Sequence, residues 1–581
     1  MKILGISAFF HDSAAALVID GEVVAAAQEE RFTRKKHDAD LPVRSVEFCL
    51  AHAGITMADV DHVVFYEKPL QKFERILVTG LQEFPWGLPQ LTRSLTSWLG
   101  GRLWMRGDLC ARLGCRDDQL LFSEHHLSHA ASSFLTSPFK SAAILTVDGV
   151  GEWTTTAIHR ASSDDTGTRI EALRELHFPH SIGLLYSSLT AFLGFEVNEG
   201  EYKVMGLASY GQPRFLDEMK QLCTVNADAS MELDLRYFSF HRHPTRSFTP
   251  ALEGLLGVAR LPNAPLQLPP RSEEDQRFAD IAASLQRFTE DYLLALAHEA
   301  HRLTGERHLC LAGGVALNCV ANGRIAREGP FDDVFVHPAA GDSGGAVGAA
   351  LWASHVLLGV PRRETTPSPF LGAAATSAEV ASVVQDLRLP HEQFSDDTTL
   401  MAEVARRLSV GEVGGFFRGR FEWGPRALGA RSILADARHH GMRDRINRKI
   451  KFREGFRPFA PAALEEDVPR FFHAQASDAL LRTHMLSVTR VREDAQQQLP
   501  SITHVDGTAR VQSVSPSSDA PFRPLLEAFK ARTGVGVLLN TSMNLKDEPL
   551  VSSPTEACAL FLQSDLDFLV LEDCLVTRRA A

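Results

Sequence analysis

The sequence predicts an α/β protein of at least two domains, and three observations lead to this fold class. A chain of 581 residues exceeds the size at which a single hydrophobic core keeps growing. Short apolar strands flank turns that carry an aspartate, first at His11-Asp12 and again at Asp148-Gly149. Glycine-rich turns precede predicted helices at residues 313–318 and 341–346, as strand-to-helix turns do in α/β folds.

The two aspartate turns belong to similar segments of the chain. The predicted strands are 3–6, 14–18 and 23–27 in the first segment, and 142–147 and 153–158 in the second. This repetition predicts a duplicated α/β domain whose two turns hold the phosphates of a nucleotide.

The remaining elements divide the chain into two parts. Residues 280–303 carry apolar side chains at helical spacing without Gly or Pro, which predicts a long amphipathic helix. The stretch 359–377 is rich in Pro and small residues and is a predicted linker. A second α/β segment follows from residue 402.

Composition narrows the class of protein. A net charge of −12 argues against general nucleic-acid binding, which usually requires a basic face. No apolar stretch reaches the roughly 20 residues that span a bilayer, and His11 and Asp12 interrupt the first apolar run, which makes it a poor signal peptide. The eight cysteines are scattered without CxxC spacing, as in a reducing compartment. We therefore expect a cytoplasmic globular protein.

A pair of histidines gives the sharpest local signal in the first half. The stretch EHHLSHA places His125 and His129 four residues apart, so on a helix both imidazoles project from one face. Asp148 is a candidate third ligand from the second aspartate turn, and Asp342 is a candidate fourth from the turn at 341–346. Such a set suits iron, zinc or manganese better than calcium. The residues leave open the alternative that both histidines only cap and pack a helix.

Residues 418–457 form a strongly basic window in this acidic chain. The window holds ten Arg and two Lys against four acidic residues, a local charge of +8. The planar guanidinium group matches phosphate and carboxylate oxygens with two bonds. Gly, Pro and aromatic residues interleave the arginines in WGPRALGARS and KFREGFRPFAP, so we favour a phosphate pocket over a solvated charged face. The later stretches HVDGTAR and NTSMN are candidates to complete the pocket, although NTSMN alone also fits a plain capping turn.

The order of these motifs resembles the O-carbamoyltransferases of the NodU/CmcH type, which carbamoylate nodulation factors, cephems and aminoglycosides. The stretches that carry the resemblance run nearly from end to end: GISAFFHDSAAAL, QEERFTRKKHD, EHHLSHAASSF, TVDGVGEW, GEYKVMGLASYG, LAGGVALN, GDSGGAVGAAL, GPRALGARSI, KFREGFRPFAP, HVDGTARVQ and LLNTSMN. Many motifs in one order are far more specific than any single motif.

The resemblance implies a fold and an activity for each part. Residues 1–365 are expected to form a duplicated actin-like (ASKHA) domain, and residues 366–581 a YrdC-like α/β domain. The YrdC-like domain of such proteins converts carbamoyl phosphate and ATP into carbamoyl adenylate. The actin-like domain then transfers the carbamoyl group to a hydroxyl of a small-molecule natural product, with the help of a divalent metal. Iron is the first expectation for this metal, with zinc, manganese and magnesium as alternatives.

The resemblance also implies site residues. The implied metal ligands are His125, His129, Asp148 and Asp342, and the nucleotide turn of the first domain falls on Gly313, Gly314 and Asn318. The implied contacts to carbamoyl phosphate and nucleotide in the second domain are Arg426, Arg431, Lys451, Arg453, Arg457, Arg510, Asn540 and Ser542. The acceptor alcohol also needs a proton acceptor. His11, Asp12 beside it and Lys203 are the candidates for this catalytic role.

Two other functions compete with carbamoyl transfer. A metallopeptidase would use the HxxxH pair, but the sequence lacks an HExxH helix there and the basic window would have no role. An RNA-binding protein would use the basic window, but the net charge of −12 speaks against it. We expect a hydroxylated small-molecule acceptor as partner, no nucleic acid and no membrane, and the sequence leaves a homodimer open.

Overall fold

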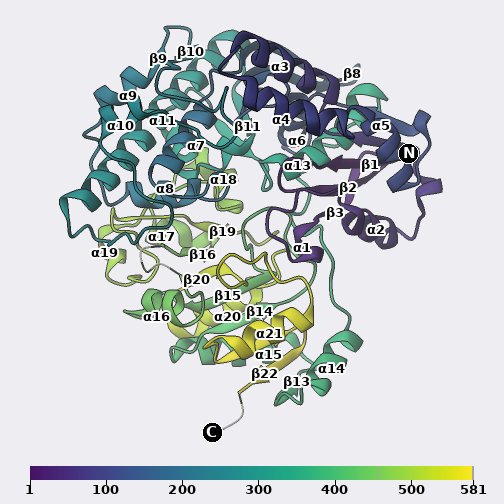
Figure 1. The fold of residues 1–581 in the computed structure, drawn as a ribbon. Helices are drawn as coiled ribbons and strands as arrows, with labels where there is room; N and C mark the ends of the chain where they lie inside the picture. Colours follow the sequence, from purple (N-terminus) through teal and green to yellow (C-terminus); the bar gives the residue numbers. More distant parts are fainter. Residues whose placement is uncertain (454, 456, 579–581) are drawn as a thin grey trace. The chain divides into compact units, whose positions relative to one another are not determined.

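The structure is a computed structural model, and it describes residues 1–453, 455 and 457–578 (Figure 1). The chain folds into two compact units. The first unit contains residues 1–7, 15–24 and 53–366, and the second contains residues 8–14, 25–52 and the chain from residue 367 onward. Two early segments thus pack with the C-terminal unit, whereas the expected division into residues 1–365 and 366–581 assigns them to the first domain.

The first sheet has five strands in the order β3-β2-β1-β4-β5. These strands are β1 (Lys2–Ser7), β2 (Ala14–Ile19), β3 (Glu22–Gln28), β4 (His62–Phe65) and β5 (Leu120–Phe122). Strands β1, β4 and β5 run parallel. Strands β1 and β2 are buried at successive positions, which requires that both faces of the sheet be covered.

The second sheet has five strands in the order β12-β11-β6-β7-β8. These strands are β6 (Ser141–Val147), β7 (Thr154–Asp164), β8 (Gly167–His177), β11 (His308–Ala312) and β12 (Asp333–Val336). Strands β6, β11 and β12 run parallel, whereas β6, β7 and β8 form an antiparallel meander. When the strands of each sheet are numbered in chain order, both sheets have the same spatial order, 3-2-1-4-5, as a duplicated α/β unit requires.

Helices surround these sheets. They are α3 (Pro69–Gln82), α4 (Leu88–Leu99), α5 (Met105–Leu113), α6 (His125–Phe134), α7 (Ile182–Phe192), α8 (Glu201–Ala208), α9 (Leu216–Leu222), α10 (Pro250–Leu256), α11 (Glu273–Thr304), α12 (Cys319–Glu328) and α13 (Asp342–Leu351), with a small sheet of β9 (Cys223–Val225) and β10 (Met231–Leu233). The helix predicted over 280–303 lies within α11. This helix starts earlier because the Ser272 hydroxyl accepts the backbone N–H of Asp275 at 3.0 Å and caps it.

Close packing of α6 against α13 positions the residues discussed below. Helix α13 has the sequence DSGGAVGAAL, and its small residues allow two helix backbones to approach. A Cβ atom on Gly348 would lie 1.8 Å from the carbonyl oxygen of Ser128 in α6, and one on Gly345 would lie 2.7 Å from the Tyr66 ring. Glycine is therefore required at both positions.

The second unit is built on a mixed sheet of eight strands in the order β13-β22-β21-β14-β15-β20-β16-β19. The strands are β13 (His391–Gln393), β14 (Gly414–Phe417), β15 (Arg431–Asp436), β16 (Ala460–Leu464), β19 (Gln512–Val514), β20 (Val537–Ser542), β21 (Phe568–Leu571) and β22 (Cys574–Thr577), with a separate pair β17 (Thr489–Arg490) and β18 (Thr508–Ala509). The helices are α1 (Glu30–Thr33), α2 (Val43–His52), α14 (Ser377–Asp386), α15 (Asp397–Ser409), α16 (Met442–Lys449), α17 (Val468–Phe471), α18 (Ala479–Thr483), α19 (Glu493–Gln496), α20 (Arg523–Thr533) and α21 (Pro554–Gln563).

Two hydrophobic clusters cover the opposite faces of this sheet. Neighbouring residues of one strand divide between them: Phe416 belongs to the cluster with α15 and α20, and Phe417 to the cluster with α14, α16 and α21. Leu538 and Leu539 of β20 divide in the same way. This alternation follows from the two-residue period of a strand. The fold is therefore mixed α/β in both units, as the sequence predicts.

Within the described residues, no helix is both long enough and apolar enough to cross a membrane.

Candidate metal centre and cationic cluster

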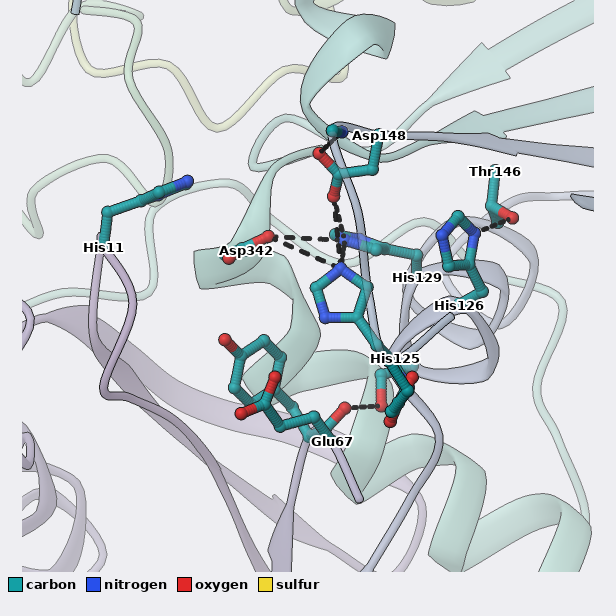
Figure 2. Close-up of polar contacts among 12 residues, drawn as sticks. His11, Glu67, His125, His126, His129, Thr146, Asp148 and Asp342 are labelled. Carbon is teal, nitrogen blue, oxygen red and sulfur yellow. Dashed lines mark hydrogen bonds and ion pairs between the residues drawn. The ribbon is translucent and has the colours of Figure 1, made fainter. Parts of the chain in front are cut away.

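Figure 2 shows His125 and His129 on one face of α6, with both imidazoles directed at Asp148 and Asp342. Asp148 follows β6, and Asp342 begins α13. His129 is fully buried, and His125 and Asp342 are nearly so. The structure thus brings together the four residues that the sequence selected as metal ligands.

The four donor atoms are spaced as ligands of one ion. The Nε2 atoms of His125 and His129 lie 3.1 Å apart, and Asp148 Oδ2 lies 3.2 Å and 3.0 Å from them. Asp342 Oδ1 lies 3.8 Å from His125 Nε2 and 3.5 Å from His129 Nε2. Four ligands at about 2.05 Å from a tetrahedral ion lie roughly 3.3 Å from one another. Imidazole nitrogens with carboxylate oxygens are a donor set for a divalent transition metal, so the residues fit such an ion.

Surrounding contacts hold these ligands in place. The backbone N–H of His125 donates to Glu152 at 3.0 Å, and the other carboxylate oxygen of Asp148 accepts the N–H of Gly149 at 2.7 Å. A Cβ atom on Gly151 would lie 2.9 Å from the His125 ring. The site is therefore preorganised by backbone contacts as well as by the ligands themselves.

The same contacts set the charge of the site. Burial acts against a charged His129, but its bonds to Asp148 and Asp342 outweigh burial and raise the pKa of His129 to about 9. Burial also acts against ionised Asp148, yet the bonds from His125 and His129 hold its pKa well below the ordinary value. At neutral pH the ionised Asp148 therefore lies against a protonated His129, whose charge takes the place of a cation.

Metal binding should expel this proton. A histidine must be neutral to ligate an ion, so binding at pH 7 should release about one proton per ion. Because the metal-free pKa of His129 is about 9, metal affinity should rise with pH between 7 and 9 and level off above it. Calorimetric titration of the metal-free protein in buffers of different ionisation enthalpy measures the release. An affinity that does not change between pH 7 and 9 would contradict the assignment.

His126 and the predicted catalytic residue Lys203 are not members of this group. His126 follows His125 in sequence, but its Nδ1 lies 2.7 Å from the hydroxyl of Thr146 (Figure 2). Burial, with the neighbouring histidines, lowers the pKa of His126 well below its usual range, so this ring is neutral. Lys203 lies on α8, where its Nζ is 6.0 Å from the centre of the Tyr202 ring.

The predicted nucleotide turn lies directly beside a metal ligand. Gly313 has a φ of +93°, and a Cβ atom there would lie 2.2 Å from the carbonyl oxygen of Val147. A Cβ atom on Gly314 would lie 3.1 Å from Asp148 Oδ1. Asn318 caps α12, since its side-chain oxygen accepts the backbone N–H of Ala321 at 3.1 Å. The two glycines therefore allow a backbone approach to Asp148 that other residues would block.

His11 and Asp12 belong to the second unit. Asp12 lies between two imidazoles: its Oδ2 is 3.0 Å from His11 Nδ1 and its Oδ1 is 2.7 Å from His37 Nδ1. Burial acts to raise the pKa of Asp12, but the two histidines hold it below its usual value. One ligand atom each of Asp12, His37 and Glu30 lie within 4.8 Å of one another. Arg31 pairs with Glu30 at 3.1 Å. The bond to Asp12 can orient the His11 ring.

Lys451 forms the buried centre of a cationic cluster in the second unit. Its Nζ donates to the carbonyl and hydroxyl oxygens of Ser542 at 2.8 and 3.2 Å, to the carbonyl oxygen of Asn544 at 2.8 Å, and to the Asn544 side chain. Burial, with the charges of Arg453 and Arg457, lowers the pKa of Lys451 well below its ordinary value. An anion that binds beside these three groups would relieve their mutual repulsion.

An early segment adds a further cation to this cluster. The charge of Lys36 also acts on Lys451. The guanidinium of Arg34 donates to the carbonyl oxygens of Leu550 and Pro549 at 2.6 and 2.9 Å, which fixes the segment against the loop after β20. We therefore place Lys36 with the cluster. Two residues of the KFREGFRPFAP stretch, 454 and 456, lie outside the described residues.

Arg426 lies on a loop whose backbone is held by one carboxylate. The side-chain oxygen Oε1 of Glu422 is fully buried and accepts the backbone N–H groups of residues 428, 429, 430 and 431 at 2.9, 3.1, 2.7 and 3.0 Å. Asn540 donates to the carbonyl oxygen of Ala427 at 3.1 Å and to Gln512 at 2.9 Å. The half-buried Arg426 is thus carried by a rigid loop.

Arg431 and Arg510 occupy different surroundings. Arg431 is fully buried, lies 3.5 Å from the centre of the Phe417 ring, and donates to the carbonyl oxygens of residues 373, 418, 419 and 430. Burial lowers the pKa of Arg431 to about 10. Through these bonds its guanidinium stabilises the loop that carries Arg426. Arg510 is half-buried, and its charge acts on His504.

Replacing Glu422 with glutamine should destabilise this loop. The amide oxygen keeps a hydrogen-bond acceptor but loses the charge, and bonds to charged groups contribute about 1 kcal/mol more than neutral ones. We expect the free energy of unfolding to fall by about 2 kcal/mol in urea denaturation. Glu527→Gln, at an exposed position of α20, is the matched control and should change it by less than about 0.5 kcal/mol. Equal effects of both substitutions would show that the four backbone contacts are unimportant.

Sequence reasoning missed three residues of these sites. Asn544 lies in the candidate NTSMN stretch just after β20, where the Ser542 hydroxyl donates to its side-chain oxygen at 2.7 Å. Lys36 lies far from the basic window in sequence, so only the fold reveals it. Glu422 is one of the four acidic residues in the basic window, and an acidic residue isolated among arginines indicates a structural role.

Comparison with known proteins identifies the family. The family models Carbamoyltransferase N-terminus and Carbamoyltransferase C-terminus match residues 2–351 and 405–578. An uncharacterized protein of Synechocystis sp. is 44% identical over 612 aligned residues, which cover 100% of this chain and 97% of the relative. Nodulation protein NolNO of Sinorhizobium fredii is 38% identical over 583 residues, which cover 99% of this chain and 80% of the relative.

A solved structure aligns more weakly. The (R)-2-hydroxyglutaryl-CoA dehydratase component A of Acidaminococcus fermentans aligns with a TM-score of 0.31 at 15% identity, over 61% of this chain and 98% of that protein. A likeness this low supports no argument about the fold. The two family models and the nodulation relative confirm the resemblance that the motifs indicate. The chain belongs to the carbamoyltransferase family.

Proposed function

We propose that the chain is an ATP-dependent O-carbamoyltransferase that makes carbamoyl adenylate in its second unit and transfers the carbamoyl group in its first. The observation that carries the proposal is the presence, in one chain, of a buried cationic cluster and a separate group of two histidines and two aspartates spaced for an ion. The first suits binding of phosphates, and the second suits activation of a carbonyl or phosphate oxygen.

The activation step is assigned to the cationic cluster around Lys451 together with Arg426 on its loop. Forming carbamoyl adenylate from carbamoyl phosphate, ATP and one water releases one orthophosphate and one pyrophosphate. Both substrates and both products are polyanions, so binding them requires fixed cations that do not reorganise during the reaction. The bonds that Lys451 donates to Ser542 and Asn544 fix Lys451, and those that Glu422 accepts from the backbone of its loop fix the segment that carries Arg426.

The transfer step is assigned to the group of His125, His129, Asp148 and Asp342. A bound divalent ion, with iron as the first choice, would supply Lewis acidity to the carbamoyl carbonyl or the adenylate phosphate. The acceptor oxygen forms a bond to the carbamoyl carbon, and AMP leaves. The acceptor proton passes to a base, for which His11, oriented by Asp12, is the proposed group, with Lys203 as the alternative.

The finer parts of the proposal follow the family resemblance. We assign an actin-like fold to the first unit, because its two sheets share one strand order, and a YrdC-like fold to the second. The proposed acceptor is a hydroxylated natural product, since a relative of this chain carries the name nodulation protein. Nucleotide is proposed to contact Gly313, Gly314 and Asn318 in the first unit.

Product stoichiometry tests the proposed function. The purified full chain is incubated with ATP and carbamoyl phosphate, and orthophosphate and pyrophosphate are measured together. We expect both products in equal amounts, and no pyrophosphate when either substrate is omitted. Pyrophosphate release that does not depend on carbamoyl phosphate, or ATP hydrolysis to ADP, would contradict the proposal. Peptide cleavage without ATP would favour the metallopeptidase alternative.

A further inference from the structure

Helices α3 and α4 form a hairpin in the first unit, followed by the short 3-10 turn Arg102–Trp104 and α5 (Figure 1). The inner sides of the hairpin pack against each other. The Phe73 and Trp98 rings lie 5.3 Å apart, and a Cβ atom on Gly80 would lie 2.6 Å from Leu91. This inner contact already uses the apolar residues that a two-helix hairpin needs for its own stability.

Both helices nevertheless carry further leucines beside this inner contact. Leucines recur in α4 at intervals of seven and four residues, and the same intervals recur in α3, so each set shares one helix face. These residues are Leu88, Leu95 and Leu99 in α4, and Leu70, Leu77 and Leu81 in α3. The first and last leucine of each stripe are exposed. The hairpin therefore has an apolar side that is half-buried at Leu77 and Leu95 and exposed at both ends of each stripe.

Aromatic side chains extend this apolar side. Phe84 and Trp86 lie in the turn between the helices, and Trp104 follows α4. Trp86 is 75% exposed and Trp104 is 74% exposed. Of the nine described large hydrophobic side chains that are more than 60% exposed, six lie between residues 70 and 104. Large exposed apolar patches mark surfaces that bind a partner.

The charge of this region differs from that of the chain. Between Glu83 and Asp108 the sequence contains three arginines and no acidic residue, whereas the whole chain carries −12. Arg93 and Arg102 are exposed. Arg106 lies 3.5 Å from Asp117 and is partly neutralised. The apolar side of the hairpin is thus bordered by local positive charge in an acidic protein.

We propose that this hairpin docks on an anionic phospholipid surface, with Phe84, Trp86 and Trp104 in the interfacial layer and Arg93 and Arg102 at the lipid phosphates. Tryptophan prefers the boundary between headgroups and acyl chains, and arginine keeps its charge at the headgroups while its stem covers apolar surface. At 12 residues, α4 is too short to span a bilayer but long enough to lie in its interface.

A second copy of the chain is the competing occupant. In a two-fold symmetric contact the same patch would meet itself. The hairpin from residue 69 to 107 carries five basic residues against two carboxylates, Glu74 and Glu83, so two copies face to face would repel. Phosphate groups pair with Arg93 and Arg102 instead. The proposal departs from the expectation of no membrane partner, which rested on the length needed to span a bilayer and not on an interfacial hairpin.

Sedimentation of the full chain with vesicles tests the proposal. Phosphatidylcholine vesicles are compared with vesicles that also contain phosphatidylglycerol. We expect binding to the anionic vesicles only, and a decrease in bound protein as salt is raised, because the headgroup attraction is screened. Failure to bind anionic vesicles, or equal binding to both kinds, would overturn the proposal.

Matched variants locate the surface. Trp86→Ser with Trp104→Ser should lower the vesicle partition coefficient by about tenfold or more, because exposed aromatic area no longer enters the interface. Arg93→Glu with Arg102→Glu should lower it at least as much and leaves every apolar contact in place. The control Val258→Ser with Leu261→Ser changes side chains that are 70% and 75% exposed outside the hairpin, and it should bind as the unmodified chain does. Circular dichroism and pyrophosphate release check that each variant is folded.

Three results would contradict the assignment. Equal loss in the control pair would show that any exposed apolar residue suffices, and full binding by both hairpin variants would place the surface elsewhere. Analytical ultracentrifugation without lipid provides the third. A dimer of the unmodified chain that the tryptophan variant converts to a monomer would show that a second copy covers the hairpin.

Discussion

Replacing His129 with alanine should remove the bound ion while leaving pyrophosphate release unchanged. His129 contributes one of four donor atoms from a fully buried position, and without it Asp148 and Asp342 lose a shared partner. We expect metal content to fall from about one ion per chain to near zero. Carbamoylation of an acceptor should fall by more than about a hundredfold. Elemental analysis and a product assay against hydroxylated natural products measure both effects.

The control for this variant is His298→Ala, which removes an exposed histidine of α11 and should keep its ion. Retention of the ion by the His129 variant would contradict the assigned ligand set. A parallel loss of pyrophosphate release in a folded His129 variant would contradict the separation of the two steps, because the cationic cluster belongs to the other unit.

Replacing Arg426 with alanine should abolish most of the activation step. Arg426 is carried by a loop that four backbone contacts to Glu422 hold rigid, so neighbouring arginines cannot easily take its place. Loss of one preorganised charge at a reacting phosphate costs about a hundredfold or more in rate. We expect pyrophosphate release to fall by about that factor, as measured by a coupled assay at saturating ATP.

An arginine of the same basic window provides the control. Arg448 is exposed on α16, and Arg448→Ala should leave the rate within about twofold, since surface charges contribute little. If both variants lose the same activity, general charge and not a defined position supports the reaction. Undiminished pyrophosphate release in the Arg426 variant would remove this residue from the site.

The metal group could be selected from sequence because part of its geometry is local. Four residues of helix bring His125 and His129 to one face whatever the rest of the chain does. The two aspartates could be proposed because they stand in turns after strands. Their approach to the histidines, however, depends on Gly348 and on the packing of α13 against α6, which local pattern does not encode.

The cationic cluster could be predicted as a region but not residue by residue. Arg426 and Arg431 stand in one motif and look equivalent in the sequence, yet Arg431 is fully buried and bonded to carbonyl oxygens, whereas Arg426 is half-buried. The charge of Lys36 acts on Lys451 across more than 400 residues of chain, an effect that only the tertiary fold creates. The leucine stripes of α3 and α4 show the same limit, because periodicity cannot tell how much of an apolar side a helix buries.

The central claim is that one chain makes carbamoyl adenylate in one unit and uses it in the other. The most direct test is a single-turnover reaction of the His129→Ala protein with ATP and isotope-labelled carbamoyl phosphate, analysed by mass spectrometry after rapid quenching. We predict that labelled carbamoyl adenylate accumulates in this variant, that it does not form in Arg426→Ala, and that the unmodified chain with an acceptor converts it to labelled product and AMP. Formation of labelled product without the adenylate, or with ADP in place of AMP, would contradict the account.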